Sequence, residues 1–152
     1  MMNQHFNIRI YGLLINEFNQ VLISDECRNG FAFTKFPGGG LKFEEGFKHA
    51  LKREFQEELN IEIEVGELFY FNEFYQASVF NPKAQIHSFY YKVFFPNWSI
   101  IVANQHEIPL TEEGEKHRWI NLQDLKISDF TFPIDKIVVQ HLLQINPLFN
   151  TL

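Results

Sequence analysis

The segment FPGGGLKFEEGFKHALKREFQEELNIEI, residues 36–63, joins a glycine-rich loop to a stretch that is crowded with acids. Three glycines occupy positions 38–40, and four of the glutamates that follow are Glu45, Glu54, Glu57 and Glu58. Apolar residues recur between them at the three- and four-residue spacing of a helix: Phe47, Ala50, Leu51, Phe55 and Leu59. This periodicity predicts a helix with one apolar face, directly after a loop that carries little side chain.

Three of the acids share one side of the predicted helix. Each residue turns about 100°, so Glu54, Glu57 and Glu58 fall within an arc of about 100° beside the apolar face. Like charges at this spacing cost a few tenths of a kcal/mol each, which a solvated surface tolerates and a bound cation would remove. Carboxylate oxygens suit Mg²⁺ or Mn²⁺. The segment therefore indicates either a solvated acidic face or a metal site beside a glycine loop, able to hold a diphosphate.

The spacing of the glycine loop and the acids resembles the Nudix box, whose pattern is G-x5-E-x7-R-E-U-x-E-E-x-G-U, where U is a bulky apolar residue. The matching positions are Gly39, Glu45, Arg53, Glu54, Phe55, Glu57, Glu58 and Ile61. Asn60 stands where the pattern has glycine. Asparagine tolerates the left-handed conformation best after glycine, so we expect Asn60 to end the helix in that conformation.

The resemblance implies an α+β fold, a Nudix α/β/α sandwich with a mixed β-sheet and a loop–helix–loop motif at the active site. It also implies a single Nudix domain over residues 1–152. The implied reaction is Mg²⁺-dependent (or Mn²⁺-dependent) hydrolysis of a pyrophosphate bond in a nucleoside diphosphate linked to another moiety. ADP-ribose, nucleotide sugars and (d)NTPs are substrates of this type, and the sequence does not choose among them.

The resemblance assigns roles to residues of the box. The metal ligands that it implies are the backbone carbonyl of Gly38 and the carboxylates of Glu54, Glu57 and Glu58. The loop residues expected near the substrate are Gly39, Gly40 and Glu45. The catalytic residues that it implies are Arg53, Glu54, Glu57 and Glu113.

Arg53 and Glu45 also have structural interpretations. The Arg53 guanidinium can pair two carboxylates at once and so hold the glutamate side chains in place. Glu45 lies at the start of the predicted helix, where the dipole and the free amides favour a carboxylate. We therefore expect Glu45 to cap the helix and organise the loop.

The general base is either a glutamate of the box or an acid from a later loop. The segment PLTEEGEKHRW, residues 109–119, offers Glu112, Glu113 and Glu115. The place of Glu113, six residues before Trp119, resembles that of a late glutamate in some family members. A charged surface loop is at least as good an interpretation of this segment.

The rest of the chain predicts several strands and one more helix. Alternating or β-branched and aromatic runs indicate strands in NIRIYGLLI, QVLISD, IEIEV, ELFYFNEFY, IHSFYYKVFF and KHRWINL. A turn is expected at Asn29-Gly30, and the segment PIDKIVVQHLLQI has the start signal and spacing of a closing helix.

Charge and cysteine content restrict the partners and the compartment. The net charge of −6 argues against non-specific binding to nucleic acid or to an anionic membrane. No run of apolar residues is long enough to cross a membrane, and the N-terminus shows no secretion signal. The lone Cys27 favours a buried small residue over a nucleophile. We expect a cytoplasmic protein; because relatives often form dimers, a homodimer is an expectation of the resemblance alone.

Two other classes of function fit parts of the sequence. A non-catalytic nucleotide-sensing Nudix-like domain would keep the box without turnover, and an acidic helix could serve only for protein docking. Rings in the segment NEFYQASVFNPKAQ favour core or strand packing over stacking on a base: Phe74, Tyr75 and Phe80. Four cations could meet phosphates but are each more typical of solvated charges: Arg9, Arg28, Lys35 and Lys83.

Overall fold

The structure is a computed structural model that describes residues 3–145, and the chain divides into two compact units. The described part of unit 1 consists of residues 3–12 and 38–94. The described part of unit 2 consists of residues 13–37 and 95–145. Both units combine strands with one long helix, so the predicted α+β class is confirmed.

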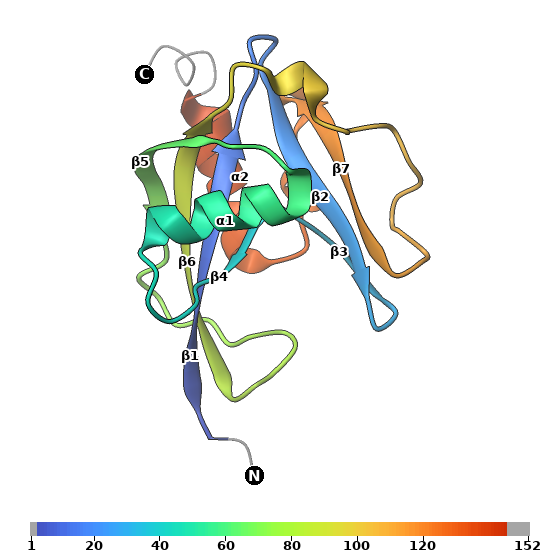
Figure 1. The fold of residues 1–152 in the computed structure, drawn as a ribbon. Helices are drawn as coiled ribbons and strands as arrows, with labels where there is room; N and C mark the ends of the chain where they lie inside the picture. Colours follow the sequence, from blue (N-terminus) through green and yellow to red (C-terminus); the bar gives the residue numbers. More distant parts are fainter. Residues whose placement is uncertain (1–2, 146–152) are drawn as a thin grey trace. The chain divides into compact units, whose positions relative to one another are not determined.

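Unit 1 contains a four-stranded sheet in the order β4-β1-β6-β5 and the helix α1 (Figure 1). Its elements are β1 (His5–Leu14, whose last two residues belong to unit 2), β4 (Gly38–Gly40), α1 (Phe47–Leu59), β5 (Glu64–Phe71) and β6 (Ala84–Phe94). The short β4, which is the glycine loop of the sequence, pairs antiparallel with β1. Helix α1 packs against β4 and β5, so this sheet positions both halves of the box.

Helix α1 forms where the apolar spacing predicts it, and it buries Ala50, Leu51 and Phe55. At its C-terminus Asn60 adopts φ 55° and ψ 43°, the left-handed conformation expected from the missing glycine, and its N–H donates to the Gln56 carbonyl. The N-terminus differs from the prediction. Gly46 is the N-cap residue and no side chain caps the helix, so the expectation that Glu45 caps it is wrong.

Close packing between α1 and the sheet depends on Gly12 in β1. A Cβ atom placed on Gly12 would lie 2.7 Å from the Phe55 ring and 3.2 Å from Val93. The Phe55 ring is fully buried. Because neither neighbour has free space to move into, glycine is required here for the helix to approach the strand.

Unit 2 contains a three-stranded sheet in the order β3-β2-β7 and the helix α2 (Figure 1). Its elements are β2 (Gln20–Arg28), β3 (Phe31–Lys35), η1 (Trp98–Ile100), β7 (Gly114–Asn121), η2 (Leu122–Asp124), η3 (Ile127–Asp129) and α2 (Pro133–Ile145). The turn between β2 and β3 lies at Asn29-Gly30, as predicted, with φ of 53° and 78°. Such angles suit the tight turn of a hairpin.

The core of unit 2 is aliphatic and aromatic. Central β2 residues Val21, Leu22 and Ile23 are fully buried. Helix α2 buries a helical stripe of Ile134, Val138, Val139 and Leu142. Trp98 and Trp119 meet edge to face, with ring centroids 5.6 Å apart. Cys27 is a buried free thiol, which confirms its interpretation as a small core residue.

The aromatic segment between β5 and β6 differs from the prediction. Phe74, Tyr75 and Phe80 are 39%, 67% and 60% exposed, so their expected packing in the core is wrong. The chain there follows an irregular loop, which holds the rings outside the sheet. No helix within residues 3–145 combines the length and the hydrophobicity that crossing a membrane requires.

Gly12→Ala should destabilise the protein by about 1–3 kcal/mol, because the added methyl group overpacks the contact with Phe55. Chemical denaturation followed by circular dichroism measures the change. Gly40→Ala is the matched control, since its Cβ would meet only the end of the Arg9 side chain, at 3.4 Å. Equal midpoints for the two variants would contradict the proposed packing role.

Candidate active site

At two positions of the glycine loop, neighbouring atoms lie so close to the backbone that a side chain would collide with them. Gly38 has φ 145°, and a Cβ there would collide with the Ile10 carbonyl oxygen. At Gly39 a Cβ would lie 2.5 Å from both Cδ and Oε1 of Glu54. The missing side chain at Gly39 thus leaves the space in which the Glu54 carboxylate rests against the loop.

Arg53 joins the acids of the helix to the loop. Its Nε and Nη2 donate to the two carboxylate oxygens of Glu45, at 2.9 and 2.7 Å. Its Nη1 donates to Glu54 at 2.9 Å and to Glu57 at 3.4 Å, and Nη2 also reaches the Gly40 carbonyl at 3.0 Å. The expectation that Arg53 pairs at least two carboxylates is confirmed.

The contacts between Arg53 and Glu45 shift the pKa of each residue. Hydrogen bonds from Arg53, together with one from the Lys42 N–H at 2.8 Å, lower the pKa of Glu45 from 4.5 to about 2. The same hydrogen bonds with Glu45 raise the pKa of Arg53. Glu45 therefore remains an ionised loop organiser at any physiological pH.

The remaining acids of the predicted site lie beside this network. Glu54 is mostly buried and Glu57 is half exposed, and both accept from Arg53. One carboxylate oxygen of Glu58 is inaccessible to solvent. Within residues 3–145 no three His, Cys, Asp or Glu side chains are gathered as metal ligands, and Glu54 and Glu57 are instead paired with Arg53.

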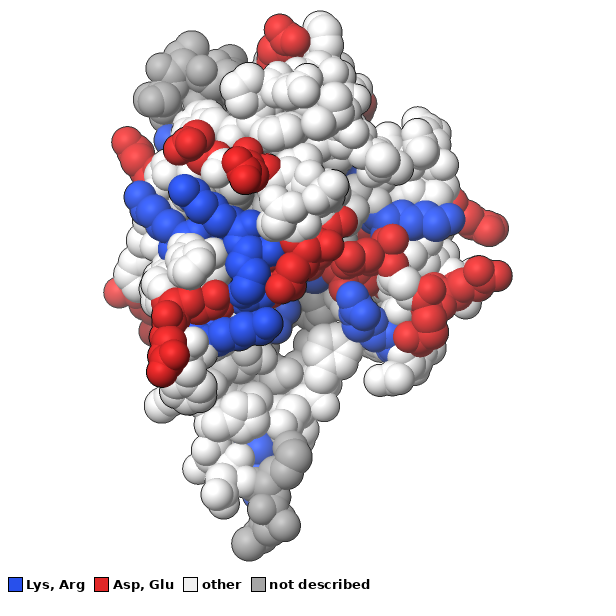
Figure 2. Space-filling view, viewed as in Figure 1, with Lys and Arg blue, Asp and Glu red and all other residues white. Residues whose placement is uncertain are grey.

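A second cation lies next to the glycine loop. Arg9 on β1 is directly opposite Gly40 in the strand register. Its Nε donates to the Tyr11 hydroxyl at 3.1 Å, and its guanidinium lies 5.8 Å from the centroid of the same ring. Figure 2 shows charges of both signs over α1 and hardly any over the start of β1. The acidic helix α1 and Arg9 on β1 therefore both lie beside the glycine loop.

The sequence model of the NUDIX domain matches residues 5–141, which is most of the chain and includes the whole glycine–helix segment. The chain belongs to the Nudix family. Membership of this family supports a hydrolase activity, and Nudix hydrolases generally use divalent metal ions. A search among curated proteins finds no match.

Solved structures share the Nudix fold at low sequence identity. The E. coli ORF135 protein superposes with a TM-score of 0.69 at 18% identity, over 96% of this chain and 94% of that one. MutT from Methanosarcina mazei Go1 gives 0.68 at 18% identity, over 97% and 99%. A mutator MutT protein from Bacillus halodurans gives 0.59 at 22% identity, over 90% and 82%. These values support the fold alone.

Glu113, the candidate late acid, belongs to unit 2, just before β7. Its Oε1 accepts a hydrogen bond from the Gly30 N–H at 3.1 Å, on an exposed part of the β2–β3 hairpin. The structure thus gives Glu113 a contact that stabilises the hairpin turn. A carboxylate with one oxygen engaged in this way keeps a second oxygen for other chemistry.

One face of the β3-β2-β7 sheet carries buried polar side chains that the sequence did not single out. Lys35 Nζ lies 2.8 Å from Glu26 Oε2, and the Ser24 hydroxyl donates to the same oxygen. Lys35 is 4% exposed, so the expectation of a solvated charge is wrong. Burial, with the nearby Lys35 charge, lowers the pKa of His117 to about 4. Only the strand register, which pairs Ser24 with both Lys35 and His117, brings this set together.

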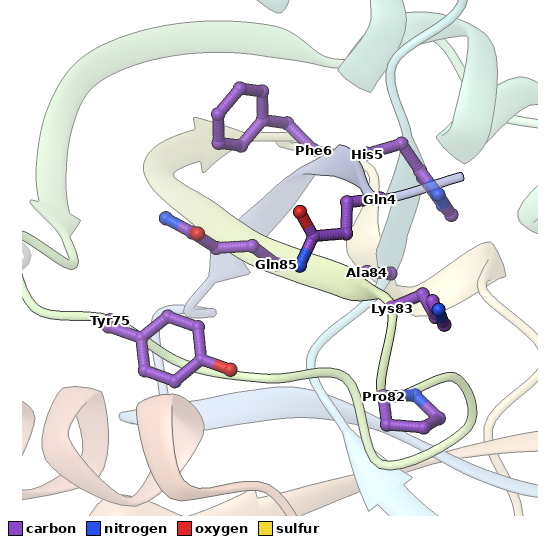
Figure 3. Close-up of a pocket in the computed structure, with 8 residues that line it drawn as sticks. All are labelled: Gln4, His5, Phe6, Tyr75, Pro82, Lys83, Ala84 and Gln85. Atoms are coloured by element: carbon purple, nitrogen blue, oxygen red, sulfur yellow. The ribbon is translucent and has the colours of Figure 1, made fainter.

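A separate pocket of about 230 Å³ opens in unit 1 at the start of β1 and β6 (Figure 3). Its lining residues are Gln4, His5, Phe6, Tyr75, Pro82, Lys83, Ala84 and Gln85. None of them is a carboxylate, so this pocket lacks the ligands that a hard divalent cation prefers.

Stability in acid should depend on Glu45. Because its folded pKa is about 2 against 4.5 unfolded, its contribution is complete above pH 4.5 and is lost as pH falls toward 2. Glu45→Gln should therefore show a shallower loss of stability over this window than the wild type. Urea denaturation at a series of pH values measures the slope. Glu62→Gln, which removes an exposed carboxylate after the helix, is the control; identical slopes for all three proteins would refute this role.

Proposed function

We propose that the protein is a Mg²⁺- or Mn²⁺-dependent Nudix pyrophosphohydrolase that cleaves a nucleoside diphosphate linked to another moiety. The observation that carries the proposal is the Glu54 carboxylate lying against the bare backbone of Gly39, with Arg53 fixing its rotamer. This arrangement brings carboxylate oxygens against a bare glycine backbone within one loop–helix motif. ADP-ribose, a nucleotide sugar or a (d)NTP would all meet these requirements.

The residues present fit a hard divalent cation by donor chemistry. Glu54, Glu57, Glu58 and the Gly38 carbonyl supply oxygens only, which Mg²⁺ and Mn²⁺ prefer. When bound, such an ion would neutralise phosphate charge and lower the pKa of coordinated water. Without that neutralisation, a chain of net charge −6 would repel a diphosphate from this acidic helix.

The protein's own residues then have distinct tasks. Arg53 holds Glu54 and Glu57 in place and, through the Gly40 carbonyl, fixes their position relative to the loop. Arg9, opposite Gly40, supplies positive charge on the other side of the loop for a phosphate oxygen. Proton removal from the attacking water falls to Glu54, Glu57 or the late acid Glu113.

Several finer expectations accompany this proposal. A cytoplasmic location rests on the lone buried Cys27, which has no second cysteine in this sequence with which to form a disulfide. The acidic net charge favours a small-molecule partner over nucleic acid or an anionic membrane. Homodimer formation rests on the family resemblance alone.

A substrate panel assayed with Mg²⁺, Mn²⁺ or EDTA tests the activity. We expect release of nucleoside monophosphate with either metal and none in EDTA. Isothermal titration calorimetry on the same panel detects binding without turnover. Such binding without turnover would indicate a nucleotide sensor. If the protein shows neither turnover nor binding, the acidic helix is better explained as a protein-docking face. Either outcome would overturn the proposal.

Glu58→Gln should lower turnover by roughly 100-fold, because it removes one charged oxygen ligand from the metal site. Glu62→Gln is the matched control, since Glu62 is exposed just beyond the helix and should leave turnover unchanged. Circular dichroism must show both variants folded. A folded Glu58→Gln protein with wild-type turnover would remove Glu58 from the site.

Glu113→Gln separates catalysis from hairpin stabilisation, because the amide oxygen of glutamine still accepts the Gly30 N–H while the basic carboxylate is gone. If Glu113 is the base, kcat should fall by roughly 100-fold or more and lose its acidic limb. Glu112→Gln is the neighbouring control. Near-wild-type turnover of Glu113→Gln from about pH 6 to about pH 9 would assign the base to the box.

A further inference from the structure

Residues 102–113, here called the strap, have no helix or strand and belong to unit 2. Most of their side chains are exposed, but that of His106 is only 6% exposed. It reaches Asp25 in the middle of β2, a residue 81 positions away in the sequence. One imidazole therefore anchors an otherwise exposed segment to the sheet.

Asp25 is the centre of this anchor and is almost completely buried. Its Oδ1 accepts from the Thr34 hydroxyl at 2.6 Å. Its Oδ2 lies 2.7 Å from both Arg118 Nε and His106 Nε2. Burial alone would raise the pKa of Asp25, but the hydrogen bonds from Arg118 and Thr34 lower it, so the carboxylate stays ionised.

Both ring nitrogens of His106 face hydrogen-bond acceptors. Nε2 meets the Asp25 carboxylate at 2.7 Å, and Nδ1 meets the Asn104 carbonyl oxygen at 2.8 Å. A carboxylate and a carbonyl accept but cannot donate. Only the doubly protonated imidazolium satisfies both contacts; either neutral tautomer places a lone pair against an oxygen.

We propose that His106 is a protonation-dependent latch, which holds the strap to the sheet as an imidazolium and releases it when the proton is lost. The latch acts on the segment that leads into Glu112 and Glu113. Thermodynamic linkage gives the sign: the contact is present at acidic pH and weakens as pH rises. The inference rests on geometry within unit 2 and holds whichever reaction the protein catalyses.

The charged groups around the latch allow the titration to be assigned. From β2 and β7, His106 faces Asp25 and Arg118, and His117 is a third neighbour with electrostatic coupling. Lys116 is opposite Asp25 in the register but is exposed. Arg118 keeps its charge at all relevant pH values. Since burial lowers the pKa of His117 to about 4, His117 is neutral throughout the range in which the strap would respond.

Hydrogen exchange read by mass spectrometry on the full chain tests the latch from about pH 5.5 to about pH 8.5, the range in which histidine exchanges its proton. Protection factors remove the intrinsic pH dependence of exchange. In the wild type we expect protection of the strap to fall about tenfold or more across this range, the scale of one charge-assisted hydrogen bond. Peptides from α1 should show no such trend.

His106→Gln can still donate to Asp25 but carries neither a charge nor a titratable proton, so protection of its strap should be lower than in the wild type at acidic pH and should not change with pH. His5→Gln, an exposed histidine in unit 1, is the matched control and should behave as the wild type. Imidazole nitrogen chemical shifts of the wild type give an independent measurement that needs no variant. A strap whose protection does not change with pH, or a neutral His106 ring at the acidic end, would overturn the proposal.

Discussion

The Arg53 guanidinium is the interaction on which the glycine–helix motif depends. Five hydrogen bonds from this one side chain connect Glu45, Glu54, Glu57 and the Gly40 carbonyl. Without a cation among them, acids at this spacing would repel one another and turn toward solvent. A planar fork with donors in fixed directions serves better than a flexible ammonium, because it sets the angle of each carboxylate as well as its charge.

Strand β2 also carries acids that are paired with cations, here on opposite faces of its sheet. Its adjacent acids Asp25 and Glu26 point to different sides of the sheet, as alternation along a strand requires. Each is almost completely buried, and each is paired with its own cations: Arg118 for Asp25, and Lys35 and Arg28 for Glu26. Removing one partner from such a buried pair is far more costly than losing a surface ion pair.

Local sequence signals predicted the parts of the molecule that local physics determines. The α1 helix, the left-handed Asn60 and the hairpin turn at Asn29-Gly30 all follow from spacing and backbone preference within a few residues. The box itself was found from its pattern, and family membership supports it.

Contacts between residues that are far apart in the sequence could not be predicted from local patterns. In the sequence Asp25 is one polar residue within a predicted strand, and its partner His106 lies in an irregular segment without periodicity. Nothing in the local sequence therefore marks the two as partners. Lys35 has the sequence pattern of a solvated charge for the same reason: only the register of β2, β3 and β7 brings Glu26 and His117 near it. Glu45 does not cap the helix, and its carboxylate instead accepts hydrogen bonds from Arg53, eight residues later, and from the Lys42 N–H. The two tryptophans of the chain, Trp98 and Trp119, contact each other within unit 2, so selectively excited tryptophan fluorescence reports on that half of the molecule and does not detect local melting of α1.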